Sequence, residues 1–270
     1  MTGFFNLEQS NKIVSIALQA GEIAALAFKE KNFSITRKAD TSQVTSADIA
    51  VSKFLHKELT REFPQIPVIC EEGDLRDISG ELFFLIDPID GTSSFVSNSP
   101  EFAVNIALVK NSTAIFGLIY APVLDGGKMI FSNHENRVIL RHSSGEEVEI
   151  NPANYDMSSL RIVTSARTKE SNINKYIAQI YPDLQQNFSV ERISSAIKFM
   201  HLLEGKSNLY LHFRPSMEWD TAAGQALVEL INGKVKTIIS NQEEISFGES
   251  LNYRKTGFTN SGFVATIFDF

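Results

Sequence analysis

Residues 68–72 read Val-Ile-Cys-Glu-Glu, and residues 82–92 read Leu-Phe-Phe-Leu-Ile-Asp-Pro-Ile-Asp-Gly-Thr. Each stretch opens with a short apolar run typical of a buried strand, and each run ends in carboxylates. If the two strands lie in one sheet, their last residues can converge on one rim. Two carboxylates about 4 Å apart repel by roughly 4 kcal/mol at an effective dielectric near 20. Such a cluster must take up protons or bind a cation, and oxygen-only ligands favour Mg²⁺ over Zn²⁺.

The composition indicates a folded chain and leaves small anionic substrates possible. With 270 residues, of which 43% are hydrophobic, the chain can bury a full core in one large domain or two intimate lobes. A net charge of −7 and a pI near 5.3 argue against a nucleic-acid polymer as partner, because phosphate backbones require basic stripes. The single cysteine, Cys70, excludes an internal disulfide and a cysteine-based zinc cluster.

The sequence also carries no targeting or membrane signal. Residues 1–10 lack the cationic start and apolar core of a signal peptide, and no stretch approaches the roughly 18 apolar residues of a membrane span. We therefore expect a cytoplasmic protein without a transmembrane segment.

The first half of the chain predicts two helices followed by a large sheet. Apolar residues at helical spacing predict a helix over Leu7–Phe28. Thr45 and Asp48 have the spacing of a capping box, which predicts a second helix with Asp48 near its start. Apolar runs over 102–109 and 114–121, with shorter runs to residue 150, predict strands.

After residues 151–152 the pattern changes to an alternation of strands and helices, which predicts an α/β lobe. The expected elements are strands over Leu160–Thr164, Asn208–Phe213 and Val235–Ile239, and helices over Ser171–Tyr181, Ser194–Leu203 and Thr221–Ile231. No linker is long enough to separate the lobes, so residues 1–270 are expected to form one domain. Its lobes would span 1–154 and 155–270, with the site between them.

Each acidic segment also has an ordinary structural interpretation. Asp-Pro and Asp-Gly pairs are common in turns, and paired glutamates such as Glu71 and Glu72 are usually solvated. Asp48 could serve only as a helix cap. Asp220, in the segment Trp-Asp-Thr-Ala-Ala-Gly at 219–224, could be the N-cap of the helix that follows. For each segment taken alone, these alternatives stay open.

Taken together, the segments resemble the lithium-sensitive, magnesium-dependent phosphatase superfamily of inositol monophosphatases, fructose bisphosphatases and bisphosphate nucleotidases. The signature of that superfamily has an upstream acid, a Glu-Glu pair, Asp-Pro-Ile/Leu-Asp-Gly-Thr/Ser and a distal Trp-Asp-x-Ala-Ala-Gly, and all four occur here in order. The likeness runs from about residue 10 to an expected final strand at 262–267. It implies an α+β fold, a layered α-β-α-β-α sandwich with two closely packed lobes.

The resemblance also implies which residues bind metal. One Mg²⁺ would be held by Glu71, Asp87 and the carbonyl of Ile89, and a second by Asp87, Asp90 and Asp220. Asp87 would then bridge the two ions. Glu71 would also serve a third, weaker ion.

The same resemblance assigns the remaining catalytic roles. Thr92 and Asp48 would take the proton of the attacking water, Glu71 would take part in catalysis, and Glu72 would lie behind the metal ligands. In-line attack by metal-activated water needs no covalent enzyme intermediate.

Within the superfamily the chain most resembles the bacterial CysQ-type 3′(2′),5′-bisphosphate nucleotidases, which remove the 3′-phosphate from adenosine 3′,5′-bisphosphate. The segments at 101–108, 120–123, 194–199, 204–205, 251–253 and 260–263 carry that likeness. A substrate with two phosphates needs cationic or hydrogen-bond-donating groups of the protein in addition to the metals. The predicted substrate-binding residues are Gly91, Thr92, Ser93, Ser165, Ser194 and Lys198, with Arg167 and Arg214 as weaker candidates. One departure is Ser93-Ser94, where these nucleotidases usually have Lys-Glu, so a positive charge beside the phosphate site is lost.

Several alternatives remain. Inositol-1-phosphate hydrolysis is the next candidate, and a non-catalytic binding protein on the same fold is a more distant one. Two residues separate Asp87 from Asp90, which argues against the Asp-x-Asp phosphatases whose first aspartate is a nucleophile. The alternating ligands of an EF-hand are also missing. The sequence leaves open a monomer or a homodimer, the strength of lithium inhibition, and the peripheral inner-membrane association assigned to some CysQ-type proteins.

Overall fold

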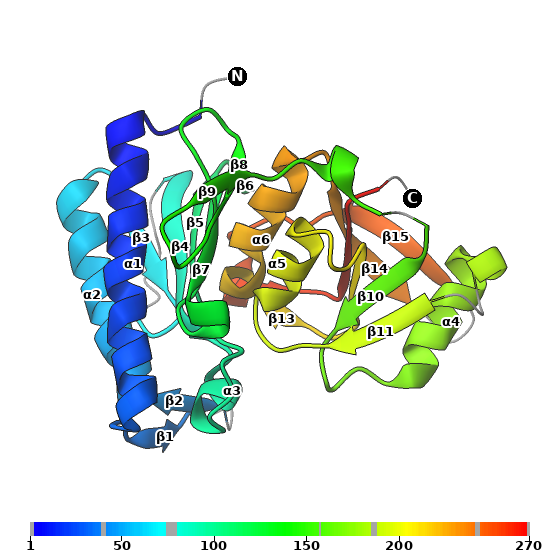
Figure 1. The fold of residues 1–270 in the computed structure, drawn as a ribbon, viewed down its shortest axis with the longest axis horizontal. Helices are drawn as coiled ribbons and strands as arrows, with labels where there is room; N and C mark the ends of the chain where they lie inside the picture. Colours follow the sequence, from blue (N-terminus) through cyan, green and yellow to red (C-terminus); the bar gives the residue numbers. More distant parts are fainter. Residues whose placement is uncertain are drawn as a thin grey trace.

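The computed structural model describes residues 3–38, 42–73, 80–156, 158–184, 188–240 and 244–268. These residues build five layers in the order helices, sheet, helices, sheet, helix (Figure 1). The predicted layered sandwich is therefore confirmed. Among the described helices, none combines the length and apolarity that a membrane crossing requires.

The first layer consists of α1 (Leu7–Glu30) and α2 (Ser46–Glu62). The predicted capping box is present at α2: the Thr45 hydroxyl accepts the N–H of Asp48, and the Asp48 carboxylate accepts the N–H of Thr45 at 2.8 Å. In the sequence, a short hairpin of β1 (Ile35–Arg37) and β2 (Gln43–Thr45) connects the two helices, and the sequence patterns did not predict it.

The second layer is a seven-stranded sheet between the two groups of helices. Its strands, in spatial order, are β3 (Val68–Cys70), β4 (Leu82–Asp90), β5 (Ala103–Lys110), β6 (Thr113–Ala121), β7 (Lys128–Ser132), β8 (Val138–Arg141) and β9 (Glu147–Glu149). Only β3 and β4 run parallel. Residues 83–86 and 102–109 are buried, because helices cover both faces of the sheet, and this explains why these stretches are apolar apart from Asn105.

Strand β4 is longer than the sequence predicted. The apolar run ends at Ile86, but the strand continues to Asp90. Its pairing with β5 shifts register between Asp87 and Asp90, so Pro88 sits in an irregular part of the ladder, where its missing N–H costs no regular hydrogen bond. The two aspartates therefore belong to the end of a strand rather than to the turn after it.

The middle layer contains α5 (Ile197–Leu203) and α6 (Glu218–Leu230), which lie between the two sheets (Figure 1). Close packing of α6 requires small residues: a Cβ on Gly117 of β6 would lie 2.2 Å from the carbonyl oxygen of Ala223. Both helices differ from the prediction at their starts. α5 begins three residues later than expected, because Ser195 has a left-handed φ of 56°, and α6 begins three residues earlier.

The second sheet has six strands and is covered on its outer face by α4 (Glu170–Ile180). Its strands, in spatial order, are β11 (Phe188–Arg192), β10 (Leu160–Thr164), β12 (Leu209–His212), β17 (Phe263–Thr266), β14 (Lys234–Ser240) and β15 (Ile245–Ser250). The edge strands β11 and β15 were not predicted, because their partly exposed sequences lack a strong apolar pattern.

Three further short elements lie near the site. Strand β13 (Ser216–Met217) pairs with β16 (Thr259–Asn260) just before α6. The one-turn helix α3 (Thr92–Val96) follows Gly91, whose φ of 94° permits a tight turn, as is common at Asp-Gly pairs.

Candidate active site

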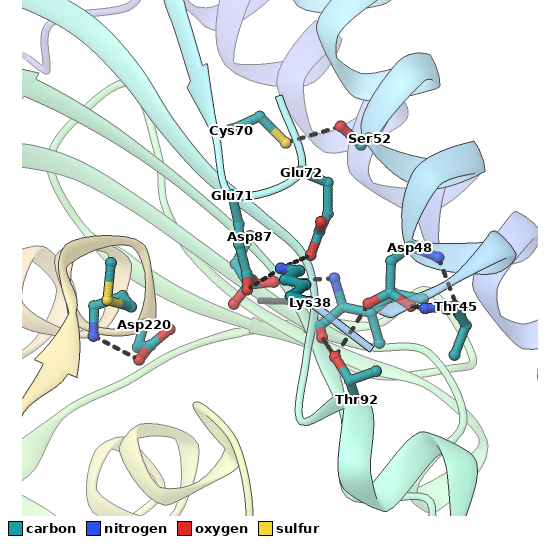
Figure 2. Close-up of polar contacts among 12 residues, drawn as sticks. Lys38, Thr45, Asp48, Ser52, Cys70, Glu71, Glu72, Asp87, Thr92 and Asp220 are labelled. Carbon is teal, nitrogen blue, oxygen red and sulfur yellow. Dashed lines mark hydrogen bonds and ion pairs between the residues drawn. The ribbon is translucent and has the colours of Figure 1, made fainter. Parts of the chain in front are cut away.

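The parallel pairing of β3 with β4 brings the two acidic segments to one rim. Cys70 pairs with Ile86, so Glu71 and Asp87 are the next residues on adjacent strands, and the N–H of Glu71 donates to the Ile86 carbonyl at 3.2 Å. The predicted convergence of the two strand ends is confirmed (Figure 2).

Three carboxylates from two distant parts of the chain form the centre of the site. One oxygen from each of Asp87, Asp90 and Asp220 lies within 4.8 Å of the others. Asp220 comes from the first turn of α6, where its Oδ2 accepts the N–H of Met217 at 2.9 Å. It is therefore the third residue of the helix and not its N-cap, since α6 begins at Glu218.

The electrostatics of this cluster fit a bound cation. Burial, followed by repulsion from neighbouring carboxylates, raises the pKa of Asp87 and of Asp220 well above the usual range for aspartate. The same cause, burial, raises the pKa of Asp90, although the Lys198 ammonium opposes the shift. Three oxygen ligands that repel one another match the preference of a hard divalent ion. The cluster could therefore hold a metal ion.

A second group of contacts joins α2 to the end of β4. The Thr92 hydroxyl lies 3.1 Å from Asp48 Oδ1, to which it donates, and 3.2 Å from the carbonyl oxygen of Ile89. The other Asp48 oxygen closes the capping box with Thr45. Burial raises the pKa of Asp48, against the hydrogen bonds from Thr45 and Thr92 that lower it. Asp48 thus serves as a cap and also contacts Thr92.

Lys38 is a site residue that the sequence analysis missed. Its Nζ lies 3.0 Å from Glu71 Oε1 and 2.5 Å from Glu72 Oε1 (Figure 2). Burial alone would lower the pKa of Lys38, but the hydrogen bonds and charges of Glu72 and Glu71 raise it overall. The two glutamates are therefore paired rather than simply solvated. No spacing rule identifies Lys38, because it follows a three-residue strand in a connection between helices.

The second lobe contributes Lys198 to the same region. Lys198 is 5% exposed, and its Nζ donates to the Ser195 carbonyl at 2.5 Å. Burial lowers the pKa of this ammonium, while the charges of Asp90 and Asp220 oppose that shift. A cavity of about 110 Å³ adjoins it, lined by Asp90, Ser195, Lys198, Tyr210, His212, Ser216, Asp220, Thr221 and Phe263. Among the described residues, His212 Nδ1 and Ser216 Oγ are buried without a hydrogen-bond partner.

The other predicted substrate residues lie at varying places around this centre. Ser93 is exposed on α3, and the N–H of Ser194 donates to Glu101 Oε2 at 2.9 Å. Ser165 follows β10, where its hydroxyl accepts the N–H of Arg167 at 3.2 Å, and it does not line the cavity beside Lys198. Both Arg167 and Arg214 are exposed.

Two further residues, Asn105 and Glu218, make hydrogen bonds that support the site. Asn105 is buried on β5 and donates to Asp90 Oδ2 at 3.3 Å; a polar residue in the otherwise apolar stretch 103–109 was a usable signal. Glu218 is fully buried, and its carboxylate accepts the backbone N–H groups of Arg254 and Lys255 at 2.6 and 2.8 Å. Its role is thus to hold that loop.

Comparisons with known proteins match nearly the whole chain. The inositol monophosphatase family matches residues 6–262. The 3′(2′),5′-bisphosphate nucleotidase CysQ of Buchnera aphidicola subsp. Acyrthosiphon pisum is 31% identical over 95% of this chain and 92% of the relative. The protein of the same name from Salmonella typhimurium is 29% identical over 95% and 99%. The crystal structure of CysQ from Bacteroides thetaiotaomicron, described as a bacterial member of the same family, superposes with a TM-score of 0.75 at 23% identity, covering 99% of this chain and all of the other.

Proposed function

The chain belongs to the inositol monophosphatase family, and from this membership we propose that it is a magnesium-dependent phosphatase that removes the 3′-phosphate from adenosine 3′,5′-bisphosphate. Two relatives named as 3′(2′),5′-bisphosphate nucleotidases, similar over 95% of the chain, support this substrate. The observation that carries the reaction type is the cluster of Asp87, Asp90 and Asp220 beside the Thr92–Asp48 pair.

The proposed metal ligands are all oxygens. We assign one magnesium to Glu71, Asp87 and the carbonyl of Ile89, and a second to Asp87, Asp90 and Asp220; a third, weaker position falls to Glu71. The short distances among the three aspartates and their raised pKa values support a cation at this place. When bound, the metals lower the pKa of a water molecule and stabilise the leaving oxygen of the ester.

In this proposal Thr92 and Asp48 together take up the proton of the attacking water. The Thr92 hydroxyl donates to Asp48 Oδ1, so its oxygen can accept a proton from the attacking water while its own proton passes to the Asp48 carboxylate. Asp48 is held in place by Thr45, so it keeps Thr92 in this orientation. Burial raises the pKa of Asp48, which suits a carboxylate that shares a proton during the reaction.

Recognition of a second phosphate falls to the second lobe in this proposal. Lys198 offers an ammonium next to the carboxylate cluster, and the adjoining cavity carries the unpartnered polar atoms of His212 and Ser216. Gly91, Thr92 and Ser93 would bind the phosphate under attack through the start of α3. We also keep Ser194 and Ser165 as predicted contacts of the nucleotide.

The partner in this proposal is a small nucleotide bisphosphate and not a nucleic-acid polymer. A cytoplasmic location belongs to the same proposal, and the free, buried thiol of Cys70 is consistent with a reducing compartment.

A substrate comparison tests the proposal. With saturating Mg²⁺, we expect kcat/KM for adenosine 3′,5′-bisphosphate to exceed that for inositol 1-phosphate by about 100-fold or more, and added Li⁺ to inhibit both reactions. Lys198→Met should reduce this preference, whereas Lys206→Met, which removes an exposed lysine from the end of the same helical region, should not. A higher kcat/KM for inositol 1-phosphate would move the protein to the inositol phosphatases. No magnesium-dependent phosphate release from any ester would favour a non-catalytic binding protein.

A further inference from the structure

The turn that joins β11 to α5 contacts the acidic cluster through its backbone. The N–H of Ala196 donates to Asp90 Oδ2, and the carbonyl of Ser195 accepts from Lys198 Nζ at 2.5 Å. Ser195 itself has a left-handed φ of 56°. A residue with a side chain keeps this conformation only where its surroundings hold it. The geometry of this turn therefore depends on contacts from outside it.

Glu101 supplies such a contact from the other lobe. Its Oε2 accepts the N–H of Ser194 at 2.9 Å across 93 positions of sequence. The backbone of Glu101 is in turn fixed against the catalytic segment: its carbonyl oxygen would lie 2.8 Å from a Cβ on Gly91, and Asp90 pairs with Ala103, two residues further on. A Cβ on Gly91 would also lie 3.0 Å from the Cβ of Ser195. Glu101 thus joins the two segments that meet at this point.

We propose that Glu101 is a positioning residue that holds the turn at residues 194–196 against Asp90 and thereby sets the position of Lys198. A carboxylate suits this task, because its hydrogen bond with a backbone N–H is charge-assisted and shorter than a neutral one. The Glu101 side chain does not line the cavity beside Lys198; its hydrogen bond holds the turn, and its negative charge also raises the pKa of Lys198 against the effect of burial. This inference rests on the proposed function only for its kinetic readout.

Hydrogen–deuterium exchange tests the positioning role without any substrate. Glu101→Met keeps the length of the side chain and removes the acceptor, and we expect amide exchange in the peptide spanning residues 193–199 to rise by about tenfold. Glu101→Ala should do the same. Glu101→Gln should restore slow exchange, because its amide oxygen can still accept from Ser194. Glu191→Ala serves as a matched control, since Glu191 contacts the far end of α5 through His201 and not the turn. Unchanged exchange in Glu101→Met would overturn the proposal.

Kinetics separates positioning from a general loss of structure. For adenosine 3′,5′-bisphosphate, Glu101→Met should raise KM about tenfold and change kcat by less than about threefold, because the three aspartates remain on β4 and α6. In a Lys198→Met background the same change should alter KM by less than about twofold, since the residue being positioned is gone. Fully additive effects of the two substitutions would contradict the proposal. If the wild-type protein instead hydrolyses inositol 1-phosphate, the proposed substrate is wrong. The exchange measurement, and the double-mutant cycle of Glu101→Met with Lys198→Met measured on inositol 1-phosphate, still decide the role of Glu101.

Discussion

Asp48 combines two roles that its sequence position presented as alternatives. One carboxylate oxygen completes the capping box of α2, and the other accepts the hydroxyl of Thr92. Both roles are possible because an ionised carboxylate has two oxygens and about four lone-pair directions. The cap therefore fixes the orientation of a carboxylate that also faces the site. A carboxylate at a helix start can therefore satisfy the helix and still accept a hydrogen bond from a neighbouring side chain.

The Thr92 hydroxyl can be tested by an isosteric change. Thr92→Val removes the hydroxyl and keeps the shape, so kcat should fall by about 10²- to 10³-fold, as expected for the loss of a general-base relay. The melting temperature should stay within about 3 °C of wild type, because the side chain is only partly buried. Thr113→Val, at an exposed position of β6, is the control and should leave kcat unchanged. A Thr92→Val enzyme with near-normal turnover would remove Thr92 from the proton path.

The pairing of Lys38 with Glu71 and Glu72 predicts competition between an internal ammonium and a metal ion. Lys38→Met should lower the Mg²⁺ concentration for half-maximal thermal stabilisation by about threefold or more, because Glu71 no longer has a built-in cation nearby. The metal-free variant should also melt at a lower temperature than wild type, since two carboxylates lose their partner. Lys53→Met, an exposed change on α2, is the control. Weaker magnesium binding by Lys38→Met would show that Lys38 supports the metal rather than competing with it.

At the scale of single elements, α6 determines how the site is assembled. Its first turn carries Asp220, and its small residues allow it to approach the first sheet on one side and α5 on the other. A Cβ on Gly224 would lie 2.2 Å from the Phe199 ring, and Phe199 is one residue from Lys198. The segment Ala-Ala-Gly after Asp220 is therefore a packing requirement that keeps α6 and α5 close. This close packing fixes the distance between the side chains of the two helices.

Gly224→Ala tests this packing. Alanine favours a helix over glycine by about 1 kcal/mol, but the added methyl group must displace the Phe199 ring or the helix. We expect the free energy of unfolding in urea to fall by about 1–3 kcal/mol, the usual range for an overpacked core. Asn11→Ala, at an exposed position of α1, controls for helix propensity and should be neutral or slightly stabilising. A more stable Gly224→Ala protein would show that α5 and α6 can separate at no cost.

At the scale of the whole molecule, the packing of the first sheet against α6 holds three carboxylates close together. Asp87 and Asp90 come from the first sheet, while Asp220 and Lys198 come from the helices that separate it from the second. The cores on both sides of the first sheet hold these elements in place, so the carboxylates cannot move apart to relieve their repulsion. We expect this repulsion to make the stability of the fold depend on pH and on bound metal.

The sign of this pH dependence follows from the raised pKa values of Asp87 and Asp220. A carboxyl whose pKa is higher in the folded state than in the unfolded state stabilises the fold below the unfolded pKa, near 4, and loses that contribution as pH rises through the folded pKa. The metal-free protein should therefore lose melting temperature as pH rises above about 4, and the increase caused by Mg²⁺ should grow over the same interval.

Thermal unfolding in EDTA and in excess Mg²⁺, measured across this pH range, checks the expectation. Asp87→Asn removes one of the repelling charges, so its metal-free form should show a flatter pH dependence and a smaller gain from Mg²⁺. Glu8→Ala, in the exposed first turn of α1, is the control. A magnesium effect that does not change with pH would mean that the cluster is already ionised throughout.

The sequence by itself determined the local parts of this protein. The strands at 68–70 and 82–86, the capping box at Thr45, the turn at Gly91 and the identity of the acidic residues all follow from patterns that span fewer than about ten residues. The sequence patterns did not predict the edge strands β11 and β15, because exposed edge strands carry little apolar signal. The patterns also placed the start of α5 too early, because the left-handed conformation of a single residue, Ser195, sets where the helix begins.

Only the tertiary structure decided which side chains meet. Asp220 reaches Asp87 because α6 packs on the first sheet. Lys38, just after β1, reaches Glu71, and Glu101 reaches Ser194 across the two lobes. Each of these contacts joins residues that are 33 or more positions apart. Their distances depend on how whole elements pack, and no local pattern encodes that packing, because burial and close approach are properties of the assembled core.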